Sequence, residues 1–219
     1  MTFDLLTLSL RVTVTALILM LPVGTWLAYW MAKGKGFAGK SALETLLLLP
    51  LVLPPTVVGF GLLVVLGHGT SFGDWLNTRA GISLLFTWQG AAVAASIMAL
   101  PLFVKSAATA FGSVDREYLE AGRIQGASEW CLFWSILVPL SKSGLAAGLS
   151  LASARAIGEF GATLMVAGSI PGKTQTMPLA LYEAVQSGQD GVAWSIALSL
   201  ACASFGLLSL VGFWEKRRE

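Results

Sequence analysis

The sequence predicts an all-α integral membrane protein with about five transmembrane helices. Of its 219 residues, 55% are hydrophobic and only 12% are charged, about half the charged fraction of a typical soluble domain. The chain also contains long apolar stretches, and a membrane-spanning helix needs about 20 such residues. These observations favour one transmembrane domain over residues 1–219. We expect membrane lipid, and no nucleic acid, among its partners.

Five windows of the sequence have the length and apolar character of a membrane span. They are Val12–Ala32, Thr45–Leu66, Ile82–Val104, Leu145–Ala167 and Val192–Phe213. Each is mostly apolar over about 20 residues, which is the length needed to cross the hydrocarbon core. The first is too long for a cleavable signal peptide and lacks a small-residue cleavage pattern.

The distribution of positive charge predicts the orientation of these spans. Ten of the fourteen lysines and arginines fall between spans one and two, between spans three and four, or after span five. Because cytoplasmic loops are enriched in lysine and arginine, these connections are predicted to be cytoplasmic. The N-terminus is then outside and the C-terminus inside.

One short motif suggests nucleotide binding but lacks its usual surroundings. The segment Gly34–Ser41 fits the pattern G-x-x-x-x-G-K-[ST]. That pattern cradles phosphates only after a β-strand and within a soluble parallel sheet, whereas here it lies between two spans. We therefore expect a cytoplasmic turn, and no cofactor, metal or catalytic site in this chain. Any ATP and magnesium would be bound by a separate subunit.

A charged segment at about residues 105–143 interrupts the apolar sequence. A long charged loop in a membrane protein is typical of a surface that binds another protein. Small residues would let a short helix of this loop fit closely into a groove on that protein. Gly126 would permit a sharp turn between two helical pieces, and Glu117 suits the start of a helix.

The same segment resembles the E-A-A-x3-G-x9-I-x-L-P signature of ABC importer permeases. The chain departs from it at Gly122, in place of the second alanine, and at Val138, in place of leucine. The resemblance implies a coupling loop that docks on an ATPase subunit and transmits its movements. The residues expected to form this loop's coupling surface are Glu117, Glu120, Ala121, Gly122, Gly126, Ile136 and Pro139.

Two further stretches, Leu49–Gly59 and Ala154–Thr163, resemble the molybdate permeases within this group. The resemblance implies a type I importer of the cell inner membrane, with molybdate as substrate and tungstate as a related oxyanion. It also implies a homodimer that forms the pathway, two ATPase subunits on the cytoplasmic side and an external oxyanion-binding protein. The sulfate and thiosulfate permeases share the loop and are the near alternative.

Two groups of residues are candidates for the pathway or its gate. Arg155 and Glu159 lie four residues apart, so they are expected to share one helix face, and charges within a span are costly and usually functional. Pro50, Pro54 and Pro55 interrupt the second span, which is tolerated only against protein or a water-filled cavity. The pathway candidates at this interruption are Pro54, Pro55 and Thr56. For both groups, a role in helix packing alone is an equally good interpretation.

Two other classes of protein fit the composition. A membrane-embedded enzyme would need clustered catalytic residues, and the carboxylates of this chain show no recognisable spacing. A channel would need no ATPase, and a loop for docking a partner would then be superfluous. A transport subunit without its own ATPase site remains the favoured class.

Overall fold

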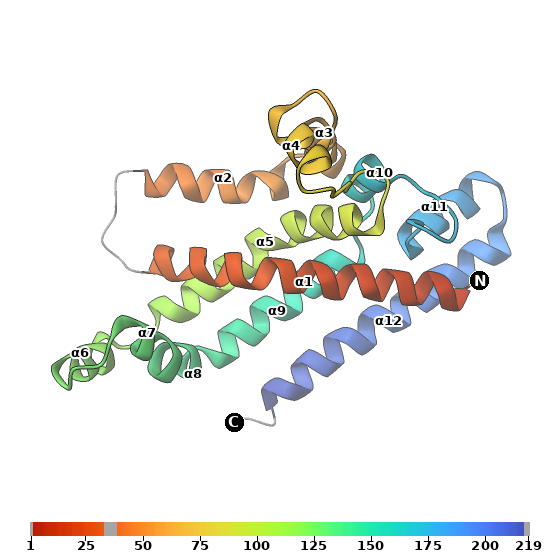
Figure 1. Cartoon of the computed structure of the whole chain (residues 1–219). Helices are drawn as coiled ribbons and strands as arrows, with labels where there is room; N and C mark the ends of the chain where they lie inside the picture. Colours follow the sequence, from red (N-terminus) through yellow and green to blue (C-terminus); the bar gives the residue numbers. More distant parts are fainter. Residues whose placement is uncertain (1, 33–38, 217–219) are drawn as a thin grey trace.

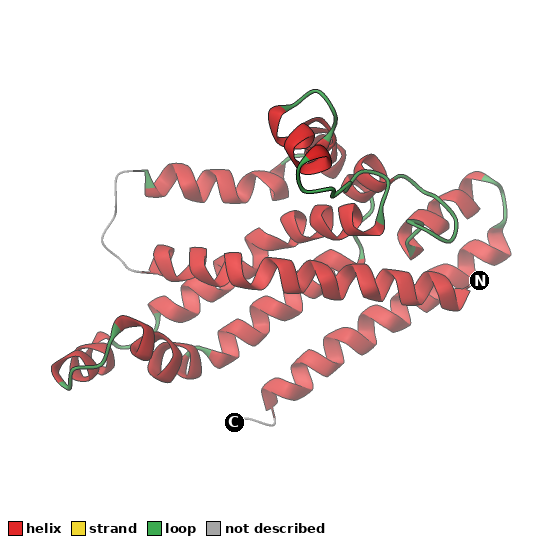
Figure 2. Cartoon of the chain, in the orientation of Figure 1, coloured by secondary structure: helices red, strands yellow, loops and turns green. Residues whose placement is uncertain are grey.

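The computed structural model describes residues 2–32 and 39–216 of the chain. In that part of the chain every regular element is a helix (Figures 1 and 2). The α-helices are α1 (Thr2–Ala32), α2 (Lys40–Val52), α3 (Pro55–Leu66), α4 (Ser71–Thr78), α5 (Trp88–Gly112), α6 (Arg116–Ile124), α7 (Glu129–Leu132), α8 (Val138–Leu140), α9 (Lys142–Ile157), α10 (Gly161–Ala167), α11 (Met177–Gln186) and α12 (Asp190–Lys216), and one π-helix, η1, covers Phe133–Leu137.

The core of the molecule lies where α5 packs against both α1 and α9. The face of α5 in this core is built largely from alanines without solvent exposure, among them Ala91, Ala95 and Ala99. A Cβ atom on Gly24 of α1 would lie 2.7 Å from the Phe103 ring, so α1 can approach α5 this closely only with glycine there. Small residues of this kind let transmembrane helices pack without a hydrophobic driving force between them.

Helix length and hydropathy give three candidate spans, or five when two bent helix pairs are each counted as one span. The three continuous candidates are Phe3–Ala32, Trp88–Gly112 and Asp190–Ser209. They correspond to the first, third and fifth predicted windows. The first bent pair, Lys40–Val52 with Pro55–Leu66, corresponds to the second window. The other, Glu129–Leu140 with Lys142–Ile157, shares only α9 with the fourth window, so the predicted number of spans is reached only with bent pairs included.

The second window consists of α2 and α3, whose axes differ in direction by 111°. The break falls at Leu53 and Pro54, and Pro55 begins α3. Proline fixes φ and has no N–H to donate, so it suits the first position of a new helix. Pro50 lies inside α2 and does not end it. The predicted interruption is therefore confirmed at Pro54 and Pro55 and is wrong at Pro50.

The third window is displaced along the chain. Its helix begins at Trp88 instead of Ile82, because Thr87 is the N-cap and its hydroxyl accepts the Gly90 N–H at 3.2 Å. The helix then continues to Gly112, so Lys105 lies in a span and not in the loop predicted for residues 105–143. Since α9 begins at Lys142, the observed connection is the shorter stretch 113–141.

The fourth window is not one helix. The first part, α9, ends at Ile157, and α10 begins only at Gly161. Arg155 therefore lies in the last turn of a helix, whereas Glu159 lies beyond its end. The prediction that these two residues share one helix face is wrong, because the backbone leaves helical geometry at 158–160.

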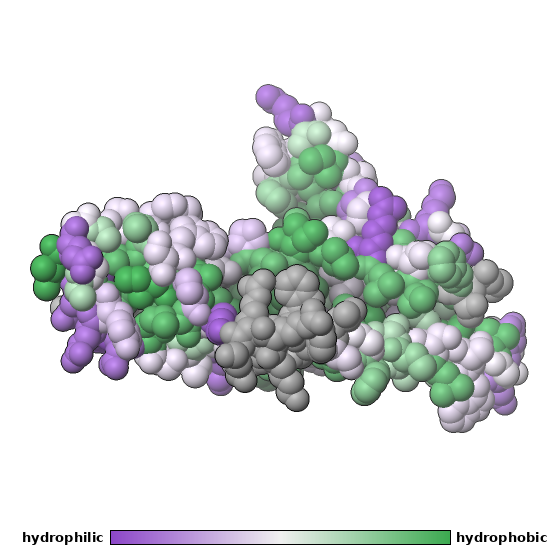
Figure 3. All heavy atoms as spheres, turned by 90° about the horizontal axis from the view of Figure 1, so that it is seen from below, coloured by the Kyte–Doolittle hydropathy of each residue, from purple (hydrophilic) through white to green (hydrophobic). Residues whose placement is uncertain are grey.

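The connections predicted to be cytoplasmic lie toward the same side of the molecule. The end of α1, the helices α6–α8 and the end of α12 all point that way, opposite the labelled N-terminus (Figure 1). Seen from below, hydrophobic residues are spread over much of the visible surface, and strongly hydrophilic residues appear at both ends and also nearer the middle (Figure 3). This arrangement agrees with spans that alternate in direction.

The nucleotide-motif segment is only partly described, since residues 34–38 lie outside the described ranges. Gly39 has a φ of +101°, and the Lys40 ammonium group donates to the Met31 carbonyl at 2.9 Å. Lysine thus caps the carbonyl end of α1, where a positive charge is favourable.

Candidate functional site

The breaks in the second and fourth spans are joined by close backbone contacts. A Cβ on Gly59 would lie 2.7 Å from the Ala162 Cα, and a Cβ on Gly161 would lie 3.0 Å from the Pro55 Cβ and 3.2 Å from the Thr56 nitrogen. The start of α3 therefore lies directly on the start of α10. We call residues 53–59 together with 158–162 the broken-helix junction.

Four of the five predicted pathway residues lie in this junction, although they come from two separate windows, and Arg155 lies just before it in the last turn of α9. Pro55 and Thr56 lie against Gly161, and Glu159 lies two residues before it. Thr56 and Pro54 are exposed in the single chain and Pro55 is half-buried. Irregular backbone within a membrane protein is tolerated where it is buried in protein or lines a water-filled cavity.

Arg155 and Glu159 form an ion pair across the break between α9 and α10. The Arg155 Nη1 contacts the Glu159 Oε2, and the Glu159 Oε1 accepts the Ala162 N–H at 2.9 Å. One carboxylate thus satisfies a free N–H at the start of α10 and holds a cation at the end of α9. The Glu159 side chain is 2% exposed, whereas that of Arg155 is 24% exposed. Arg155 is therefore the more accessible member of the pair.

The second candidate region is the α6–α8 segment, Arg116–Leu140. On α6, Glu117, Glu120 and Ala121 are all exposed. Their spacing puts them on one helix face, together with Ile124, which is 88% exposed. Sequence reasoning missed Ile124; an apolar residue four positions after Glu120 in a polar helix was the available signal. This face combines negative charge with an exposed apolar side chain.

Gly122 and Ile136 pack inside the segment. A Cβ on Gly122 would clash with the Leu132 side chain and lie 3.3 Å from the Ile136 Cδ1. The absence of a side chain at Gly122 thus lets α6 lie close to Leu132 of α7 and Ile136 of η1.

The turns of the segment lie at Gly126 and beyond Pro139. The φ of +84° at Gly126 confirms the predicted sharp turn between two helical pieces. Pro139 is exposed in α8, just before the 75° bend into α9. Unlike Gly122 and Ile136, which pack inside the segment, Pro139 is exposed.

Four residues around the α6–α8 segment were missed by sequence reasoning: Tyr29, Arg123, Glu129 and Phe133. Glu129 accepts a hydrogen bond from Tyr29 and pairs with Arg123, while Phe133 packs on Tyr29. Hydrogen bonding to Glu129 and its negative charge raise the pKa of Arg123. The available signals were an aromatic hydroxyl at the end of a span and opposite charges on either side of Gly126.

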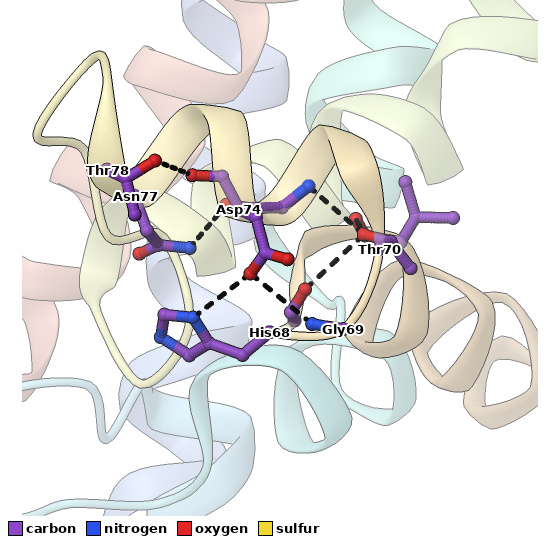
Figure 4. A network of polar contacts seen from close by, with 9 residues as sticks. His68, Gly69, Thr70, Asp74, Asn77 and Thr78 are labelled. Atoms are coloured by element: carbon purple, nitrogen blue, oxygen red, sulfur yellow. Dashed lines mark hydrogen bonds and ion pairs between the residues drawn. The ribbon is translucent and has the colours of Figure 1, made fainter.

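On the opposite side of the molecule, a polar network organises the loop before α4 (Figure 4). The Asp74 carboxylate lies 3.5 Å from the His68 Nδ1 and accepts the Gly69 N–H at 3.4 Å. The Thr70 hydroxyl caps α4 by accepting the Gly73 N–H. His68 is strongly exposed, and no metal-binding group of three His, Cys, Asp or Glu side chains occurs in the described ranges. These contacts fix a loop and form no catalytic set.

The bundle with its broken spans and charged segment belongs to a membrane transport protein, as comparison with known families shows. Residues 20–219 match the family model of the binding-protein-dependent transport system inner membrane component. The chain belongs to this family and is a multi-pass protein of the inner membrane.

Individual relatives narrow the similarity further. The chain is 43% identical over 209 residues to the permease protein YvgM of Bacillus subtilis (strain 168), covering 95% of this chain and 92% of the relative. It is 41% identical over 203 residues to the molybdenum transport system permease protein ModB of Escherichia coli (strain K12), covering 92% and 88%. The sulfate transport system permease protein CysW of Synechococcus elongatus is 32% identical, covering 95% of this chain and 74% of that protein.

Solved structures of ABC importers share the fold. A bacterial ABC transporter involved in the import of the polysaccharide alginate superposes with a TM-score of 0.78 at 14% identity, covering 98% of this chain and 79% of that chain. The inward-facing MetNI methionine ABC transporter gives 0.67 at 16% identity, covering 100% and 94%. The predicted fold of an ABC importer permease is thus confirmed.

Proposed function

We propose that this chain is the permease subunit of an ATP-driven molybdate importer, with tungstate as a related substrate. The observation that carries the proposal is the gradient of similarity. Identity is 41% to the E. coli molybdenum permease over 92% of the chain, against 32% to a cyanobacterial sulfate permease over a similar share. A sulfate or thiosulfate importer is the second candidate.

The proposed complex contains two copies of this chain, two ATPase subunits and an external oxyanion-binding protein. Family membership supports the binding protein directly, since the family is that of binding-protein-dependent systems. In this proposal ATP and magnesium are bound by the ATPase subunits. The two permease copies together enclose the path of the anion.

The α6–α8 segment is the proposed docking surface for the ATPase. Its exposed face carries Glu117, Glu120 and Ala121, and none of the three is buried against the rest of the chain. Ile124 extends this face with an apolar contact that is 88% exposed in the single chain. The match of this face to the importer signature supports its use as a docking surface.

The broken-helix junction is the proposed gate for the anion. Arg155 offers a guanidinium group with five N–H donors, which suits an oxyanion. Glu159 fixes its position and offsets part of its charge, so the anion is attracted without being held tightly. Pro54, Pro55 and Thr56 supply backbone and hydroxyl groups on the facing element.

The proposal is tested by uptake of labelled molybdate and labelled sulfate at trace concentration, in cells with this gene deleted and then restored. We expect deletion to abolish molybdate uptake and restoration to recover it, with sulfate uptake unchanged. Loss of sulfate uptake alone would favour the second candidate. No change in either uptake would contradict an oxyanion importer altogether.

A further inference from the structure

Phe133 of the α6–α8 segment fits between the ends of two spans. Its ring lies edge-on to Tyr29 of α1, with ring centroids 5.2 Å apart, and to Phe111 of α5, with centroids 5.9 Å apart. Phe111 is only 4% exposed, so this contact belongs to the core. Edge-to-face aromatic pairs have a preferred geometry and therefore resist sliding.

Glu129 links the same place to α6. Its Oε2 accepts a hydrogen bond from the Tyr29 hydroxyl at 3.2 Å. The Arg123 Nε donates to its Oε1 at 2.7 Å, and the Arg123 Nη2 donates to its Oε2 at 3.4 Å. A two-pronged arginine–carboxylate pair fixes orientation as well as distance. Tyr29 therefore contacts the segment through its ring and through its hydroxyl.

Beside these contacts a cavity separates α6 from the two spans, and Tyr29, Glu129 and Phe133 line one part of it. It has a volume of about 420 Å³ and is lined by Ala32 and Gly112 on one side and by Arg116, Leu119 and Glu120 on the other. Residues 113–115 join α6 to α5 along the chain. Across the cavity, the contacts of Tyr29 with Glu129 and Phe133 link the α6–α8 segment to α1.

We propose that Tyr29 is a positioning residue for transport, and that Tyr29, Glu129 and Phe133 form a joint that passes movement of the α6–α8 segment to α1. We call these three residues the Tyr29 joint. The inference rests on the proposed function, in which an ATPase moves this segment. It adds the route by which that movement reaches the first span, which packs along α5 over much of its length.

The test uses the complete transporter, reconstituted with its ATPase and binding protein in vesicles. The measured quantity is the number of molybdate ions taken up per ATP hydrolysed, at matched amounts of assembled complex. Tyr29→Phe keeps the ring and removes only the hydroxyl; we expect this ratio to fall about three- to tenfold, the size typical of one lost hydrogen bond. Tyr29→Ala removes the ring contact as well, so its ratio should fall further.

Two controls separate a joint from general structural damage. Tyr182→Phe removes another exposed tyrosine hydroxyl, which contacts Gln186 on α11, and should leave the ratio unchanged. Glu129→Gln combined with Tyr29→Phe should lower the ratio no more than the stronger single change, because both act on one contact.

The inference is overturned if Tyr29→Phe and Tyr29→Ala keep the wild-type ratio, or if uptake and ATP hydrolysis fall in parallel. If the wild-type complex carries sulfate and not molybdate, the ratio is measured with sulfate. In that case the proposed substrate fails while the joint is still tested.

Discussion

The broken-helix junction and the α6–α8 segment are held together by different kinds of contact. At the junction, backbone meets backbone: Gly59 lies on the Cα of Ala162, and neither can turn away. In the segment, Gly122 meets the ends of the Leu132 and Ile136 side chains, which can rotate. Larger residues in place of the glycines at the junction should therefore disturb the packing. In the α6–α8 segment, many substitutions should leave folding unaffected.

This difference separates structural from functional reasons for a residue. Glu120 and Ala121 are exposed and have no packing role in the single chain, so their match to a docking signature calls for a partner. Glu159 is buried and contacts both α9 and α10, so its substitution should first lower the stability of the fold. Substitutions at the junction should therefore lower the stability of the fold, whereas substitutions on the exposed face of α6 should mainly weaken ATPase binding.

The largest effect on stability is expected for Arg155→Met. This change leaves the Glu159 carboxylate, only 2% exposed, without its cation, and removing one partner of a buried pair costs about 3–5 kcal/mol. Thermal unfolding of the purified protein should show a clearly lower Tm. Adding Glu159→Gln should restore most of it, because the amide oxygen still accepts the Ala162 N–H. A single variant as stable as wild type would contradict the structural role of the pair.

The next effect is expected at the contact between α3 and α10. Gly59→Ala forces the new Cβ to within 2.7 Å of the Ala162 Cα, and overpacking of this kind costs about 1–3 kcal/mol. Gly61→Ala is the matched control, since a Cβ at that position would meet no neighbouring element within 4 Å. Equal melting temperatures for the two variants would show that the helices are not in close contact.

A smaller effect is expected at the turn of the α6–α8 segment. Gly126 has a φ of +84°, and a side chain in left-handed backbone costs about 1–2 kcal/mol. Gly126→Ala should therefore shift the orientation of α6 and weaken ATPase binding more than it lowers Tm. Gly112→Ala, in helical backbone with open space around it, should leave ATPase binding unchanged. Full binding by Gly126→Ala would mean that this turn is not required for docking.

The smallest effect on stability, with a clear effect on coupling, is expected for Ala121→Gln. The residue is exposed, and surface changes usually alter stability by less than about 0.5 kcal/mol. The larger side chain should nevertheless reduce the amount of ATPase that copurifies with the permease. Ser135→Gln, exposed on η1, provides a control of similar size. If both variants retain the ATPase equally, the face of α6 is not the docking surface.

The sequence predicted the spans well because apolar length is a property of each window by itself. It misplaced their ends where local contacts decide, as at Thr87, whose hydroxyl begins α5 six residues later than hydropathy suggests. The exit from helical backbone after Ile157 was also missed, because Gly158–Phe160 lies inside an apolar run. At Thr87 the deciding contact is a hydrogen bond, to which hydropathy is insensitive.

The candidate site was predictable where residues act within one motif. The turn at Gly126 follows from the glycine between two helical pieces, and Glu120 and Ala121 of the α6 face follow from the resemblance to the importer signature, whereas Ile124 was missed. The meeting of Pro55 with Gly161, and of Tyr29 with Glu129 100 residues away along the chain, depends on how helices pack in three dimensions. A single sequence shows each of these residues but not its partner.

The central claim is that the anion crosses at the junction while the α6–α8 segment drives its transport. The most direct test is ATP-driven molybdate uptake by a doubly neutral variant that combines Arg155→Met with Glu159→Gln. The variant should assemble with its ATPase and hydrolyse ATP when the binding protein is added, yet take up at least about tenfold less molybdate, as expected for the loss of an interaction with a charged group. Uptake at the wild-type rate would contradict the account, and would mean that the pair serves helix packing alone.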